Sequence, residues 1–186
     1  PTVEVLSFPA YLNQDETVIS ATSSDENGVV SLCLSEGDRE RCVTEATHAF
    51  DWTVSVTSGS TVLTVTAWDP AGNGASTQVS TTVDRVAPVA ALAIETSTPG
   101  FAAARTVTLT LTASDDGAGL ASVAFGEADV FGEAQAIDAF FENVGSFEYA
   151  LSEGDGPKTV QAKVLDKAGN ETIATDGIVL DTTPPE

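Results

Sequence analysis

Basic residues are scarce in this chain of 186 residues. Lys and Arg together number 7 against 28 Asp and Glu, which gives a net charge of −21. This balance excludes nucleic acid as a partner, because binding to phosphates requires clusters of Lys and Arg. It also argues against an anionic membrane surface. Since 42% of the residues are hydrophobic, the chain can still bury cores, and its acidity does not predict disorder.

Long hydrophobic runs, Met and catalytic motifs are missing as well. No run approaches the roughly 20 residues that cross a bilayer, so we expect no membrane insertion. The absence of Met, together with Pro1 at the start, predicts a piece of a longer protein. The single histidine, His48, has no nucleophile-elbow Ser beside it, and HExxH and phosphate-binding Gly patterns are absent. We therefore predict that the chain is not an enzyme.

A repeat divides the chain into two copies. Residues 68–73 read Trp-Asp-Pro-Ala-Gly-Asn, and 97 positions later residues 165–170 read Leu-Asp-Lys-Ala-Gly-Asn. Asp84 and Asp181 have the same spacing. A fixed period of this kind indicates tandem modules. We predict domains at 1–87 and 88–183, an insertion at about 124–146 in the second, and the start of a further linker or repeat at 184–186.

Each copy has the pattern of an antiparallel β-sandwich. Thr and Val dominate runs that alternate with a period of two, such as 63–67, 107–112 and 160–164. Turn-forming residues separate these runs at short intervals. About seven short strands per copy are typical of an immunoglobulin-like sandwich. The predicted fold class is therefore all-β, with two tandem antiparallel immunoglobulin-like β-sandwiches. The insertion lacks clean alternation and predicts a short helix or an extended loop.

An alternating strand, Asp-x-Ala-Gly-Asn, another strand and Asp-Thr-Thr-Pro-Pro follow one another at 159–185. This pattern resembles the tandem bacterial immunoglobulin-like (Big-type) repeats of large surface proteins and adhesins. Residues 62–88 match it with Val-Asp-Arg-Val-Ala-Pro at the end. The resemblance implies stalk or spacer modules, sometimes with calcium between them and sometimes with ligand-binding tips.

The two cysteines predict a disulfide. Cys33 and Cys42 are nine positions apart, and a Gly-containing tip lies between two alternating runs, so a hairpin would place the thiols opposite each other. Closing a loop of about ten residues stabilises a fold by roughly 2.5 kcal/mol and implies an oxidising compartment. The alternatives are free buried thiols or a metal site with His48, whose spacing is unlike that of zinc motifs.

Acidic residues at the predicted module junction form a candidate calcium site. In a sandwich, the turn containing Asp166 lies at the same end as Asp115 and Asp116, and this end faces the linker residue Asp84. Converging carboxylates suit Ca²⁺, which takes six to eight oxygen ligands. The alternative is that these acids only form turns. Weaker candidates are Asp25, Glu26 and Asp69 at the matching end of the first copy, and Asp181 at the junction with a third copy.

The insertion carries aromatic residues among acids and is a candidate ligand-binding site through Phe125, Phe131 and Phe140. The alternative is that these rings complete the core of the second copy, which has Leu165 at the position of Trp68.

We therefore expect a non-catalytic stalk segment of an extracellular or bacterial cell-surface, adhesin-like protein, whose partners are the neighbouring immunoglobulin-like repeats of the same chain. One alternative is a module that binds a glycan or a host protein through the insertion. Another is a spacer attached to a secreted hydrolase.

Overall fold

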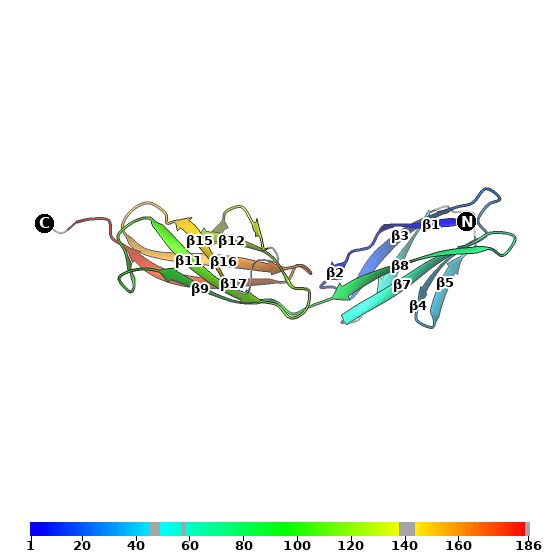
Figure 1. The fold of residues 1–186 in the computed structure, drawn as a ribbon, viewed down its shortest axis with the longest axis horizontal. Coiled ribbons are helices and arrows are strands. Elements are labelled where there is room, and N and C mark those ends of the chain that lie inside the picture. Colours follow the sequence, from blue (N-terminus) through cyan, green and yellow to red (C-terminus); the bar gives the residue numbers. More distant parts are fainter. Residues whose placement is uncertain (45–48, 57–58, 138–143, 185–186) are drawn as a thin grey trace. The chain divides into compact units, whose positions relative to one another are not determined.

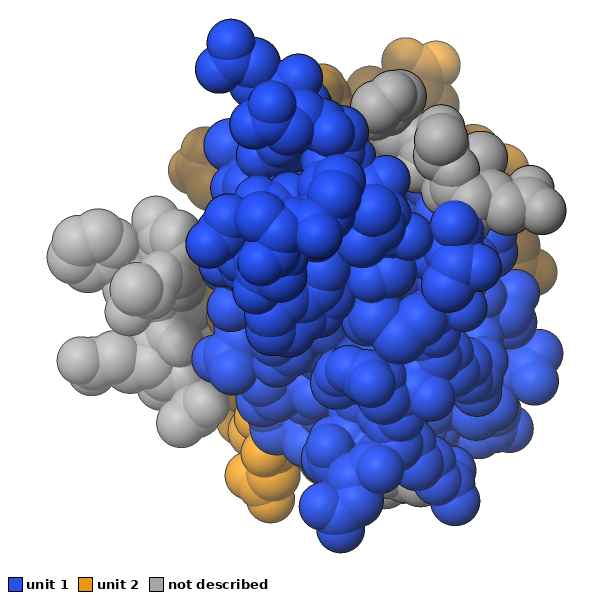
Figure 2. Space-filling view, turned by 90° about the vertical axis from the view of Figure 1, so that its right-hand side faces the viewer, with its two compact units in different colours: residues 1–85 blue, residues 86–186 orange. Residues whose placement is uncertain are grey.

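The chain folds into two compact units, Pro1–Arg85 and Val86–Glu186. The structure is a computed structural model, and it describes residues 1–44, 49–56, 59–137 and 144–184. Figure 1 traces the strands, and Figure 2 colours the first unit blue and the second orange. Over the described ranges, no helix is long and apolar enough to cross a membrane.

The first unit is a sandwich of a three-stranded and a five-stranded sheet. The smaller sheet has the order β1-β3-β6 and the larger one β2-β8-β7-β4-β5. All pairs are antiparallel except β2 with β8. The strands are β1 (Thr2–Ser7), β2 (Tyr11–Leu12), β3 (Glu16–Ser24), β4 (Ser31–Glu36), β5 (Arg39–Val43), β6 (Ala49–Ser55), β7 (Gly59–Trp68) and β8 (Gly74–Val83).

The second unit repeats this plan. Its smaller sheet has the order β15-β11-β9, and its larger sheet has the order β10-β17-β16-β12-β13, with β14 also paired to β12. The strands are β9 (Val89–Glu95), β10 (Phe101–Ala102), β11 (Thr106–Ser114), β12 (Leu120–Glu127), β13 (Val130–Phe131), β14 (Gln135–Ala136), β15 (Val144–Ala150), β16 (Gly156–Asp166) and β17 (Glu171–Leu180).

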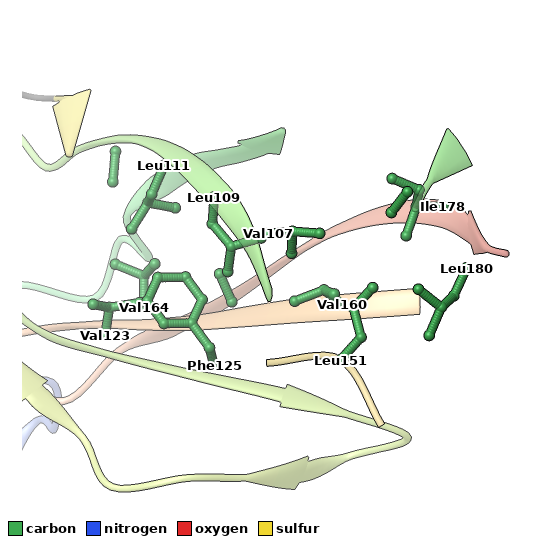
Figure 3. Close-up of a cluster of buried hydrophobic side chains, with 13 residues drawn as sticks. Val107, Leu109, Leu111, Val123, Phe125, Leu151, Val160, Val164, Ile178 and Leu180 are labelled. Atoms are coloured by element: carbon green, nitrogen blue, oxygen red, sulfur yellow. The ribbon is translucent and has the colours of Figure 1, made fainter. Parts of the chain in front are cut away.

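Period-two alternation builds the core of each unit. In β11, Val107, Leu109 and Leu111 point inward and are buried, while the intervening threonines face outward. They meet Val160 and Val164 of β16, which belongs to the other sheet (Figure 3). The side chains of β3 and β6 meet those of β4 and β7 in the same way in the first unit. The prediction of two tandem immunoglobulin-like β-sandwiches is confirmed.

The insertion is built differently from the prediction. In its described part, to residue 137, there is neither a helix nor an extended loop: β12 continues to Glu127, and β13 and β14 add short stretches of edge strand to it. Between these stretches the amide of Gly132 donates to the carbonyl of Phe125 at 2.9 Å. The extra residues therefore widen the larger sheet of the second unit.

The aromatic residues also differ in part from the expectation. Phe125 is buried and packs against Phe147 and Tyr149, so it does complete the core. However, it does not replace a buried Trp68, because Trp68 is 41% exposed. The buried tryptophan of the first unit is Trp52, which packs against Phe50.

Asp176 links the two sheets of the second unit, and its removal is expected to destabilise that unit. Its carboxylate in β17 accepts a hydrogen bond at 2.8 Å from the partly buried backbone amide of Ile94 in β9. An Asp176→Ala variant leaves this amide without its acceptor, which costs about 1–3 kcal/mol. Calorimetric melting should show the loss. Asp176→Asn keeps an acceptor oxygen, so an equal loss in both variants would contradict this role.

Candidate functional site: aspartates at the ends of the sandwiches

The same aspartate-capped turn ends β7 in the first unit and β16 in the second. Asp166 accepts hydrogen bonds from both the backbone and the side-chain amide of Asn170, at 2.8 and 2.7 Å. Asp69 accepts the same two bonds from Asn73 and a third from the amide of Ala71. The glycines of the two turns have φ values of 84° and 89°, which side chains rarely adopt. The Asp-x-Ala-Gly-Asn pattern thus has a structural role in both units.

Asp166 and Asp115 lie together in the second unit. One carboxylate oxygen of each is within 4.8 Å of the other, close enough for both to bind one metal ion. Asp166 is buried and Asp115 partly buried. Asp115 directly follows β11 and accepts hydrogen bonds from the amides of Gly117 and Gly119 at 3.1 and 2.6 Å. Asp116 is exposed, and within the described ranges it forms no close group with these two.

The linker that opens the second unit is anchored at the same turn. The side-chain amide of Asn170 donates to the carbonyl of Val86 at 3.3 Å, in addition to its bond with Asp166. The hydroxyl of Thr172 donates to the carbonyl of Pro88. Sequence reasoning missed both anchors. The two anchoring residues belong to the sequence Asn170-Glu171-Thr172, which resembles a glycosylation acceptor. The first copy has Ala75 at the position of Thr172, so this anchor is particular to the second copy.

The matching end of the first unit contains Asp25 and Asp69. Asp25 accepts a hydrogen bond at 2.8 Å from the backbone amide of Asn27. Asp69 accepts its three bonds within its own turn. Glu26 is exposed. Asp25 and Asp69 therefore each serve as hydrogen-bond acceptors for a turn at this end.

The segment that follows β17 is held by a different set of contacts. The amide of Asp181 donates to the carbonyl of Ala102 at 2.9 Å, as that of Asp84 donates to Leu12 at 2.7 Å in the first unit. Asp155 accepts hydrogen bonds from Thr182 and Thr183, and these bonds lower its pKa. In the first unit, the guanidinium of Arg85 instead pairs with Asp15. Each unit therefore fixes the start of the linker that follows it.

The cysteines form the predicted disulfide. Cys33 in β4 and Cys42 in β5 are directly opposite in the antiparallel register, with an S–S distance of 2.09 Å. Because both sulfurs are used in this bond, they are not free for a metal. His48, the third residue of the alternative metal site, lies outside the described residues.

The predicted ligand-binding rings are dispersed. Phe125 is a core residue. Phe131 is half-buried on the outer side of the larger sheet, where the ammonium of Lys163 lies 4.9 Å from its ring centre. Phe140 lies outside the described residues. A cavity of about 470 Å³ does open beside β14, lined by Phe125, Gly132, Glu133, Ala134, Gln135, Glu148 and Tyr149.

The lowered pKa of Asp69 predicts a loss of stability in acid. The hydrogen bond from the side chain of Asn73 is the largest cause of that lowering, and it favours the ionised carboxylate. The contribution of this hydrogen bond to the stability of the folded unit is therefore fully present above pH 3.8, the ordinary pKa of an aspartate. It is lost as the pH falls through the lower pKa that Asp69 has in the folded unit. Both tryptophans, Trp52 and Trp68, lie in the first unit, so tryptophan fluorescence follows its melting.

The melting temperature of the first unit should therefore fall below about pH 4. The amide of an Asp69→Asn variant does not titrate, so the variant should be less stable at neutral pH and should lose less between pH 6 and pH 2.5. Parallel acid profiles in the two proteins would show that Asp69 has no such role.

Comparison with known proteins gives the fold and no closer relationship. No family model and no curated protein matches the sequence. Among solved structures, the fibronectin(III)-like modules of CbhA from Clostridium thermocellum match with 18% identity and a TM-score of 0.61, over 96% of this chain and 93% of that one.

Two further matches are to adhesion proteins. A tetra-tandem repeat from the extending region of a large adhesion protein has 21% identity and a TM-score of 0.41. A Ca²⁺-stabilised adhesin of an Antarctic bacterium that binds ice has 19% identity and a TM-score of 0.43. This chain spans about half the length of each, 49%, with 97% of its own length covered. With a TM-score above 0.5, the similarity in fold is to the fibronectin(III)-like modules of CbhA.

Proposed function

We propose that the chain is a non-catalytic stalk or spacer segment of a bacterial secreted or cell-surface adhesin-like protein, stiffened by calcium where its two modules join. Its partners are then the neighbouring repeats of the same chain. The similarity in fold to tandem modules supports the spacer role, and the disulfide suits an extracellular location.

The observation that carries the calcium proposal is the closeness of Asp115 and Asp166. Two carboxylates within 4.8 Å repel each other, and a divalent cation relieves this repulsion. Hard oxygen ligands of this kind suit calcium. The proposed ligand set is Asp115 and Asp166 with Asp84, and Asp116 adds charge nearby.

Chain connectivity supports including Asp84. Val86 is anchored to Asn170, which itself holds Asp166. Asp84 precedes Val86 by two residues, so its Cα stays within about 7–8 Å of that of Val86 whatever the arrangement of the modules. In the proposed site, the linker supplies Asp84 as the third carboxylate.

Melting in calcium, in EGTA and in an equal concentration of Mg²⁺ tests this proposal. At a net charge of −21 any divalent cation screens repulsion, so only the difference between calcium and magnesium is informative. Calcium at 100 times its dissociation constant should add about 2.7 kcal/mol, which raises the melting temperature by several degrees.

The calcium-selective rise should disappear in Asp84→Ala. It should persist in Asp38→Ala, which removes the same charge from the exposed β4–β5 turn. Equal melting in all three conditions, or equal loss of the rise in both variants, would contradict the proposed site.

One observation favours a second candidate function, ligand binding by the second module. The cavity of about 470 Å³ beside β14 combines the rings of Phe125 and Tyr149 with Glu133 and Glu148. Burial and the carboxylate of Glu127 raise the pKa of Tyr149, so its hydroxyl stays protonated. An aromatic and acidic cavity suits a cationic or hydroxyl-rich ligand. A glycan panel compared between the intact chain and Tyr149→Phe tests this candidate, and an absence of binding counts against it.

A further inference from the structure

The outer surface of the larger sheet in the first unit carries no charge along its two longest strands. β7 and β8 contain no Asp, Glu, Lys or Arg in 20 residues. The corresponding strands of the second unit, β16 and β17, contain five charged residues. We call the outward side of β7 and β8 the neutral face, and it includes Val62, Thr64, Trp68, Ser76, Gln78 and Ser80. In a chain with a net charge of −21, such a face is exceptional.

Trp68 forms an aromatic platform at one end of this face. It pairs across the sheet with Gly74 and is 41% exposed. A Cβ atom on Gly74 would lie 2.8, 3.0 and 3.1 Å from three adjacent atoms of the indole ring. Near-equal distances to adjacent atoms require that the ring presents its face, rather than its edge, to Gly74. The ring therefore lies flat on the sheet, and its other face is directed away from the strand.

This platform depends on a pair of residues that the second unit lacks. There, Leu165 pairs with Glu171 at the corresponding position. Only a residue without a side chain leaves room for an indole lying flat on the neighbouring strand, so Trp68 and Gly74 act together. The neutral face is thus particular to the first unit and does not follow from the fold.

Hydrogen-bonding groups continue from the platform along the strands. Ser76, Gln78 and Ser80 are exposed on β8 and repeat about every 7 Å. The side-chain amide of Gln78 donates to the hydroxyl of Thr64 at 3.2 Å, which orients its carbonyl oxygen as an acceptor. Val62, 51% exposed, lies on the same face about 20 Å from Trp68. The face therefore offers one flat aromatic ring and a row of uncharged donors and acceptors.

We propose that the neutral face binds a neutral polysaccharide. Such a polymer presents flat C–H surfaces, which pack on an exposed indole, and uncharged hydroxyls, which pair with Ser, Thr and Gln. An acidic polymer would be repelled by the net charge of −21. Protein interfaces are typically depleted in Ser and enriched in several aromatic and Arg residues, which fits this surface poorly.

Native affinity electrophoresis in gels with hydroxyethyl cellulose, xyloglucan or dextran tests the proposal, with carboxymethyl cellulose as the charged counterpart. At least one neutral polymer should retard the chain, and carboxymethyl cellulose should not. Trp68→Leu, which installs the residue of the second unit, should weaken binding by about threefold or more. Gly74→Ala should also weaken it, because the added Cβ displaces the ring.

The matched control is Ile173→Ala, which removes an exposed apolar residue from the corresponding sheet of the second unit and should leave binding unchanged. Circular dichroism must show that each variant is folded. Failure of all three neutral polymers to retard the chain, or unchanged binding in folded Trp68→Leu, would overturn the proposal. Self-association in sedimentation that Trp68→Leu abolishes would also overturn it, since the face would then serve a second copy of the chain.

Discussion

Replacing Asp166 by alanine is expected to lower the free energy of unfolding of the second unit by about 2–4 kcal/mol. The carboxylate is 2% exposed and accepts two hydrogen bonds from Asn170. Without it, two partly buried donors of Asn170 lose their acceptor, and each such loss costs about 1–3 kcal/mol. Relief of the repulsion from Asp115 offsets part of this cost.

The effect of Asp166→Ala should extend to the linker. The side chain of Asn170 holds both Asp166 and the carbonyl of Val86, so an unrestrained Asn170 should release Val86. Amide hydrogen exchange should then become faster at Val86 and Ala87 as well as in the turn. Calorimetry should show the loss of stability, whereas tryptophan fluorescence, which follows only the first unit, should be unchanged. A shift of less than 1 kcal/mol would show that the turn does not depend on its aspartate.

The second large effect is expected from the disulfide. Replacing both Cys33 and Cys42 by serine should destabilise the first unit by about 2.5 kcal/mol, because the loop of about ten residues is no longer closed in the unfolded chain. For a unit of 85 residues this corresponds to a fall of roughly 10–20 °C in melting temperature.

Tryptophan fluorescence should report this fall, and a calorimetric transition of the second unit should keep its position. Reduction of the natural chain with dithiothreitol should reproduce the shift, and the serine variant should not respond to the reductant. Unchanged melting after verified reduction would contradict a stabilising role for the bond.

Period-two alternation made the fold predictable. The runs at 63–67, 107–112 and 160–164 lie within β7, β11 and β16, and their inward residues form the cores. The cysteine pair was predictable for a related reason, since a hairpin with a Gly-containing tip puts the two residues in register. Local patterns of this kind are encoded within a few residues of one another.

The insertion was harder to predict because β13 and β14 have two residues each, too few for alternation to show. The predicted start at 124 also cut through β12, in which Val123 and Phe125 continue the inward pattern. Phe125 was therefore considered as a ligand contact although its spacing already indicated the core.

The anchors of the linker could not be read from local patterns. Asn170 and Val86 are 84 positions apart, as are Thr172 and Pro88, and their contact arises only when β9 and β17 lie together in the folded unit. The exposure of Trp68 could not be predicted from local patterns either. It depends on Gly74, whose position opposite Trp68 follows from the register of β7 with β8.

The central claim, a junction stiffened by calcium, is tested most directly by ¹⁵N relaxation of the intact chain in calcium and in EGTA. Two modules joined by a rigid junction tumble as one particle, whereas hinged modules tumble partly independently. In calcium, rotational correlation times should rise in both units and fit one common diffusion tensor, and the rise should be absent in Asp84→Ala. Correlation times that are the same in calcium, magnesium and EGTA would contradict the claim.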